Sequence, residues 1–122
     1  MSGFTNRVFV YGTLKRGQRN DHYLRAAEFV GHFTTVSIYS MFVFDDYPAV
    51  SLQGRHAIRG EVYHVSDEQF RLLDELEWYP EFYQRIEIPT DFGDAWMYIV
   101  KHQLCQGKQQ IEGVWPFIEC EF

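Results

Sequence analysis

The sequence predicts a single α+β domain of mostly antiparallel strands with few helices, and three observations support this class. Short runs rich in Val, Ile, Phe and Tyr recur between clusters of turn residues. One segment has a convincing helical period, and no repeat or linker divides the chain. The 122 residues, 46% hydrophobic and 18% aromatic, are enough to bury one core. We therefore expect residues 1–122 to form one folded domain.

The first half of the chain predicts strands separated by turn residues, together with one short helix. Val, Phe and Tyr indicate a strand over residues 7–11, which ends at Gly12. Asn20 and Asp21 can cap a short helix over residues 24–27. Further strands are expected over residues 28–52, interrupted by a turn at 45–48, and over residues 57–65.

The second half contains the long helix, expected over residues 66–78. Ser66 and Gln69, three positions apart, form a capping box that starts this helix, and Pro80 ends it. Beyond the helix, strands over 82–89 and 95–101 are expected to form a hairpin around the loop 90–94, whereas residues 104–122 receive no assignment.

Charge and composition exclude several classes of function. The formal net charge is −6 and the basic residues are scattered, so we expect no nucleic-acid partner. The N-terminus lacks the apolar run of a signal peptide, and no segment approaches the ~18 apolar residues of a membrane span. A soluble, cytoplasmic protein without a membrane partner is therefore expected. The five histidines show no metal-ligand spacing, so we expect no metal site.

A glycine-bounded loop follows the first strand, where residues 8–17 have the sequence VFVYGTLKRG. Its two glycines, Gly12 and Gly17, have the spacing that begins a phosphate-binding P-loop. Gln18 and Arg19 stand where that motif needs Lys followed by Ser or Thr, so a nucleotide site is not predicted. Two interpretations stay open, namely a plain tight turn and a loop whose successive N–H groups bind one carboxylate.

The long helix carries one acidic residue on its apolar side. At ~100° per residue, Glu77 falls between Leu73 and Phe70, whereas the other charged residues of the helix fall on the opposite side. Burial against apolar side chains would raise the pKa of this carboxyl above its ordinary value. Alternatively, Glu77 lies near the helix end, where its side chain can bend out to water.

The two features together resemble the gamma-glutamylcyclotransferase family in its AIG2-like branch. Residues 8–17 are similar to the family's YG(S/T)L substrate loop, and residues 73–85 match the pattern L-D-x-x-E-x-x-P-x-x-Y-x-R. This pattern places the family's catalytic glutamate at Glu77. Residues 60–63 are similar to the family strand before the helix, and the form YGTLKRG most resembles gamma-glutamylamine cyclotransferase. The resemblance covers roughly residues 7–100.

The resemblance implies a fold, a reaction and a set of site residues. The implied fold is a mixed, mostly antiparallel β-barrel with few flanking helices. The implied reaction is the conversion of a small-molecule gamma-glutamyl amine or amino acid to 5-oxoproline and a free amine by intramolecular aminolysis, without a cofactor or metal. Glu77 would be the general acid/base, and the residues implied to bind substrate are Tyr11, Gly12, Thr13, Leu14 and Tyr83.

Further expectations concern residues around this site. Arg85 is expected to form a structural ion pair. The groups that select the leaving amine are expected in loops, such as residues 45–48, or in the C-terminal tail. An alternative function is a non-catalytic module that binds a carboxylate or gamma-glutamyl compound in the same pocket. The sequence assigns neither the particular gamma-glutamyl compound nor the oligomeric state.

Overall fold

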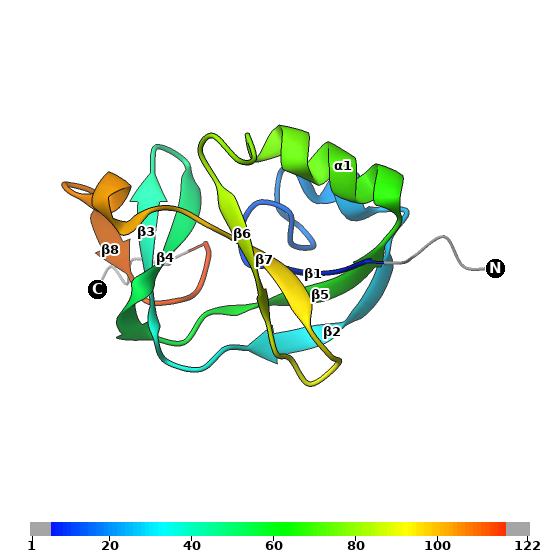
Figure 1. The fold of residues 1–122 in the computed structure, drawn as a ribbon, viewed down its shortest axis with the longest axis horizontal. Helices are drawn as coiled ribbons and strands as arrows, with labels where there is room; N and C mark the ends of the chain where they lie inside the picture. Colours follow the sequence, from blue (N-terminus) through cyan, green and yellow to red (C-terminus); the bar gives the residue numbers. More distant parts are fainter. Residues whose placement is uncertain (1–5, 117–122) are drawn as a thin grey trace.

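The computed structural model describes residues 6–116, which form two β-sheets and one α-helix (Figure 1). In chain order the elements are β1 (Asn6–Val10), the 3-10 helix η1 (Asp21–Leu24), β2 (Glu28–Thr34), β3 (Tyr39–Phe44), β4 (Tyr47–His56), β5 (Arg59–Val65), α1 (Asp67–Leu76), β6 (Gln84–Ile88), β7 (Ala95–Ile99), the 3-10 helix η2 (His102–Cys105) and β8 (Gln109–Ile111). The predicted α+β class is confirmed.

The five-stranded sheet has the order β2-β5-β1-β7-β6, and the three-stranded sheet has the order β4-β3-β8. All pairs are antiparallel except β1 with β7, which is parallel. The strands lie in two separate sheets, with β3, β4 and β8 at one end of the molecule (Figure 1). The expected closure into a barrel is therefore wrong, because within residues 6–116 no ladder of backbone hydrogen bonds joins the two sheets.

Strand β1 lies at the centre of the fold and is buried on both faces. Val8 and Val10 pack in one hydrophobic cluster with residues of α1, whereas Phe9 and Tyr11 pack in a second cluster with residues of the small sheet. Neighbouring residues of a strand point to opposite faces, which explains why consecutive residues of β1 enter different clusters. The loop that follows β1 is thus fixed between both layers of the domain.

The helix α1 begins with the predicted capping box. The Ser66 hydroxyl accepts a hydrogen bond from the Gln69 N–H at 3.1 Å, and the Ser66 N–H donates to the Gln69 side chain at 2.8 Å. The helix ends at Leu76, two residues earlier than expected, because Trp78 has a left-handed φ of 52° that the helix cannot contain. The capping box is confirmed, and the end of the helix is corrected.

Two other expectations need correction. The short helix lies at residues 21–24 rather than 24–27, and the Asn20 side chain donates to the Thr13 hydroxyl at 3.0 Å instead of capping it. The unassigned tail contains η2 and β8, and β8 pairs with β3. Its residues 117–122 lie outside the described residues. The β6–β7 hairpin is confirmed. Between residues 6 and 116, no helix is long and apolar enough to cross a membrane.

Candidate active site

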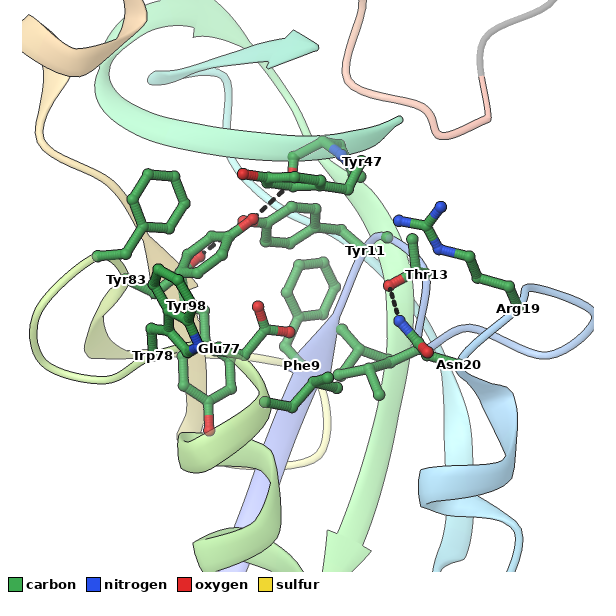
Figure 2. Close-up of a pocket in the computed structure, with 16 residues that line it drawn as sticks. Phe9, Tyr11, Thr13, Arg19, Asn20, Tyr47, Glu77, Trp78, Tyr83 and Tyr98 are labelled. Carbon is green, nitrogen blue, oxygen red and sulfur yellow. Dashed lines mark hydrogen bonds between the residues drawn. The ribbon is translucent and has the colours of Figure 1, made fainter. Parts of the chain in front are cut away.

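A cavity of about 470 Å³ lies where the loop after β1 meets the end of α1 (Figure 2). Residues from six separate stretches of the chain line it, so only the tertiary fold creates this space. They are Phe9, Val10, Tyr11, Gly12, Thr13, Leu14, Arg19, Asn20, Tyr47, Pro48, Leu76, Glu77, Trp78, Phe82, Tyr83 and Tyr98. The structure therefore brings all six predicted site residues, Tyr11 to Leu14, Glu77 and Tyr83, to one cavity.

Glu77 stands directly after the last residue of α1 and keeps the orientation of the final turn. Its N–H donates to the Leu73 carbonyl at 3.0 Å, which is the ordinary helical bond. The half-buried side chain points its carboxyl group into the cavity (Figure 2). Burial raises the pKa of Glu77 to about 7. This carboxyl can therefore release and accept a proton near neutral pH.

The Glu77 carboxylate has no hydrogen bond or ion pair to any other residue in the described part of the chain. A carboxylate that is held by a cation or by several N–H groups has a lowered pKa. Here burial acts without such compensation, which is why the pKa rises. The same acid is thus available to contact a ligand in the cavity.

The loop after β1 is held through the carbonyl groups of its first residues, while the N–H groups of Gly12, Thr13 and Leu14 stay available. The Gly12 and Thr13 carbonyls accept hydrogen bonds from the N–H groups of Lys15 and Asn20, at 3.1 and 2.9 Å. Among the described residues, the N–H groups of Gly12, Thr13 and Leu14 donate to no partner. Successive free N–H groups on a fixed turn form a small anion-binding site.

Gly12 is needed for the close approach of this loop to strand β4. A Cβ atom built on Gly12 would lie 2.7 Å from Cγ of Pro48, which is closer than side-chain atoms can pack. A side chain at this position is excluded because the space that it would enter is already filled by the Pro48 ring.

Three tyrosine hydroxyls at the cavity, those of Tyr11, Tyr83 and Tyr98, are hydrogen-bonded within the protein. Tyr11 donates to the Tyr98 carbonyl at 2.9 Å, and Tyr83 donates to the Pro48 carbonyl at 2.8 Å. Burial, followed by the charge of Glu77, raises the pKa of Tyr11 above its ordinary value. Tyr83 does not bond Glu77, but its hydroxyl oxygen keeps a lone pair that can accept a hydrogen bond from a ligand.

An ion pair fixes the C-terminal half of α1 against the β6–β7 hairpin. Arg85 donates to Asp74 at 3.1 and 3.3 Å, and the Tyr98 hydroxyl donates to the same carboxylate at 2.7 Å. The expected structural ion pair of Arg85 is confirmed. The helical wheel placed Asp74 on the solvent side, and this is wrong: Asp74 is half-buried because both partners lie under the helix.

Sequence reasoning missed several lining residues, including Arg19, Tyr47, Trp78, Phe82 and Tyr98. Trp78 and Phe82 lie inside the segment 73–85 that matches the family pattern, so this match could have indicated them as site residues. Tyr47 belongs to the segment 45–48, where leaving-group selection was expected, but it is the first residue of β4 and the turn is confined to residues 45–46. No local pattern indicated Tyr98, because its position depends on the pairing of β7 with β1.

The geometry defines a class of site. One half-buried carboxyl with a pKa of about 7 and three residues whose N–H groups have no partner among the described residues line the same cavity. Such a site can move a proton and stabilise a negatively charged oxygen on one small molecule.

Comparison with known proteins identifies the family. The family model described as "Gamma-glutamyl cyclotransferase, AIG2-like" matches residues 8–117. A relative from Vibrio cholerae is 41% identical over 92 residues, covering 75% of this chain and 79% of its own. The gamma-glutamylcyclotransferase family protein YtfP of Escherichia coli K12 is 34% identical over 110 residues, covering 89% of this chain and 95% of its own.

Solved structures agree with this result. An uncharacterized protein, PH0828 from Pyrococcus horikoshii, superposes with a TM-score of 0.77 at 31% identity, covering 90% of this chain and 89% of that one. An AIG2-like protein from mouse superposes with a TM-score of 0.70 at 28% identity, covering 78% and 76%. The chain belongs to the AIG2-like gamma-glutamyl cyclotransferase family. It is accordingly an enzyme of the gamma-glutamylcyclotransferase type.

Proposed function

We propose that this protein converts a gamma-glutamyl amine or gamma-glutamyl amino acid to 5-oxoproline and a free amine, with Glu77 as general acid/base. One observation carries the proposal: Glu77 points its carboxyl into a cavity that is also lined by Gly12, Thr13 and Leu14, whose N–H groups have no partner among the described residues. The family supports the reaction class.

The reaction is an intramolecular aminolysis. The α-ammonium of the substrate, with a pKa of roughly 8, is mostly charged at neutral pH and cannot attack. The Glu77 carboxylate removes one proton, and the freed nitrogen attacks the substrate's own γ-carbonyl carbon to close a five-membered lactam. The bond to the leaving nitrogen then breaks as Glu77 returns the proton to that nitrogen. The ring nitrogen still carries one proton too many, and it loses this second proton to the released amine, which leaves as an ammonium ion. One carboxyl group thus serves both steps, and the reaction needs no water molecule or second substrate.

The pKa of Glu77 suits this double role. A group that must first accept and then donate a proton works best when its pKa lies near the working pH. The value of about 7 for Glu77 meets this condition, whereas an exposed glutamate would stay ionised and be a poor acid. The absence of a partner for Glu77 within the described chain leaves it free to contact the substrate nitrogen.

The loop after β1 would hold the negatively charged parts of the substrate. The N–H groups of Gly12, Thr13 and Leu14 would donate to the substrate's α-carboxylate or to the γ-oxygen as charge develops on it. The Tyr11 and Tyr83 oxygens would accept from the substrate ammonium. Because the substrate carries both reacting groups, holding it in the folded conformer supplies much of the rate gain.

A finer assignment follows from the loop sequence. The form YGTLKRG in residues 11–17 resembles gamma-glutamylamine cyclotransferase, so we propose gamma-glutamyl amines as the preferred substrates. A direct test is to incubate the protein with gamma-glutamyl-lysine amides, gamma-glutamyl amino acids and glutathione, and to measure 5-oxoproline. Turnover that is lost in Glu77→Gln supports the mechanism. Saturable binding without product would instead support a binding module, and normal turnover by the variant would exclude Glu77 as the acid/base.

A further inference from the structure

Three aromatic side chains at the cavity, Tyr47, Trp78 and Phe82, remain partly exposed to solvent. The tyrosines deeper in the lining, by contrast, are buried and donate to acceptors in the protein. The available aromatic surface of the cavity therefore belongs to these three residues, which we call the aromatic rim.

Trp78 is the unusual member of the aromatic rim. Its side chain is 72% exposed and belongs to neither hydrophobic cluster of the described residues. Its φ of 52° is a left-handed conformation that a non-glycine residue adopts only at a cost in free energy. An exposed tryptophan in strained backbone adds nothing to the core, and strain of this kind concentrates at functional sites.

The backbone holds Trp78 in place despite this conformation. Its N–H donates to the Glu75 carbonyl at 3.2 Å, and its carbonyl accepts from the Phe82 N–H at 2.8 Å. The indole is therefore presented by a fixed turn that starts at the residue after Glu77. Glu77 and Trp78 are neighbours in the chain and line the same cavity, so a group bonded to an atom that Glu77 protonates can extend toward this turn.

Phe82 and Tyr47 contribute a second, rigid surface. Their rings meet edge to face with centroids 6.3 Å apart, and Phe44 supports both rings from the buried side, 5.7 Å from Phe82 and 6.1 Å from Tyr47. Aromatic rings held in this way offer flat apolar surface at little cost in side-chain entropy. The rim thus has the properties of a preformed apolar subsite.

The charges at the cavity decide which amines fit this subsite. Arg19 is the only cation among the described residues that line the cavity, and both of its terminal nitrogens are engaged by the Asp46 carboxylate. A carboxylate on the leaving amine would therefore have to compete with Asp46 for this one cation. An apolar or aromatic amine substituent carries no polar group that would lose its hydrogen bonds to water on entering this subsite.

We propose that the aromatic rim, with Trp78 as its main contact, is the subsite for the leaving amine and selects apolar or aromatic amines without a carboxylate. This inference rests on the proposed function, because Glu77 must protonate the leaving nitrogen for its substituent to begin beside Trp78. The glutamyl part of the substrate then accepts hydrogen bonds from the N–H groups of the loop after β1, and the amine substituent extends along the aromatic rim.

The test compares leaving groups that differ in one property at a time. We would measure kcat/KM for 5-oxoproline release from gamma-glutamyl phenethylamide, gamma-glutamyl methylamide and gamma-glutamyl-phenylalanine. The wild type should prefer the phenethylamide to the methylamide by about tenfold, chiefly through KM. It should also prefer the phenethylamide to gamma-glutamyl-phenylalanine, which adds only a carboxylate. Trp78→Ala should abolish most of the first preference, and Trp78→Phe should retain it.

Controls separate this subsite from general effects and from the proposed reaction. Val36→Ala removes an exposed apolar side chain outside the cavity and should leave all ratios unchanged. An unchanged phenethylamide preference in Trp78→Ala, or equal use of the carboxylate-bearing substrate by the wild type, overturns the inference. If no amide releases 5-oxoproline, the proposed function fails, and calorimetric binding of the phenethylamide decides the subsite: about tenfold weaker binding by Trp78→Ala supports it, and equal binding overturns it.

Discussion

Replacing Glu77 by glutamine should make the protein more stable at alkaline pH while removing its activity. The folded protein raises the pKa of Glu77 from its ordinary 4.5 to about 7, because burial disfavours the charged carboxylate. Below pH 4.5 the group is protonated in both the folded and the unfolded chain, and its titration costs no stability. As the pH rises from about 4.5 to about 7, the unfolded chain loses this proton first, so the folded state is progressively destabilised.

The size of this effect follows from the two pKa values. They differ by about 2.5, and each pH unit corresponds to 1.36 kcal/mol, so the full cost above pH 7 is about 3 kcal/mol. Glutamine cannot ionise and escapes this cost. Between pH 5 and pH 8, the free energy of unfolding of Glu77→Gln minus that of the wild type should therefore rise by about 2–3 kcal/mol.

Urea denaturation of both proteins at several pH values measures this difference directly. Glu75→Gln is a matched control on the same helix, because the Glu75 side chain is exposed and paired with Arg71. It should show no comparable gain between pH 5 and pH 8. Parallel stability curves for Glu77→Gln and the wild type over this range would refute the claim that Glu77 is a buried acid.

The same titration should appear in the kinetics. The carboxylate form of Glu77 must begin the reaction, so kcat/KM of the wild type should rise with pH through a midpoint near 7. Glu77→Gln should lower kcat by about 10²–10⁴-fold, whereas Glu75→Gln should stay close to the wild type. A wild-type rate without an acidic limb near pH 7 would argue against Glu77 as the base.

Two further substitutions test the framework of the site. Gly12→Ala should cost about 1–3 kcal/mol in urea denaturation, because the new Cβ would lie 2.7 Å from Cγ of the Pro48 ring; a variant as stable as the wild type would show that the loop and β4 are not in close contact. Asp74→Ala should cost about 2–4 kcal/mol, because Arg85 and the Tyr98 hydroxyl would lose their half-buried acceptor. A loss below about 0.5 kcal/mol, typical of an exposed surface pair, would contradict the buried ion pair.

Sequence reasoning worked best where the signal comes from residues close together in the chain. The capping box at Ser66 and the β6–β7 hairpin depend on contacts within one turn or across one loop. The orientation of Glu77 also follows from helical periodicity, because its N–H keeps the bond to the Leu73 carbonyl. These features need no knowledge of distant parts of the chain.

The same reasoning failed where distant partners decide the outcome. Asp74 was placed on the solvent side because the helical wheel cannot know that Arg85 and Tyr98 lie beneath it. Asn20 is a good capping residue by type, yet its side chain bonds Thr13. The strands could have closed into one sheet or formed two, and strand composition does not distinguish these arrangements.

The sequence by itself determined the α+β class, the family motifs and the two local features of the site, a glycine loop and an acid on an apolar helix face. The tertiary structure decided that these features, about sixty residues apart in the sequence, share one cavity with Tyr47, Trp78 and Phe82. Periodicity and capping are set by neighbours in the chain. The enclosure that raises the pKa of Glu77 to about 7 is set by elements that meet only when the whole chain folds.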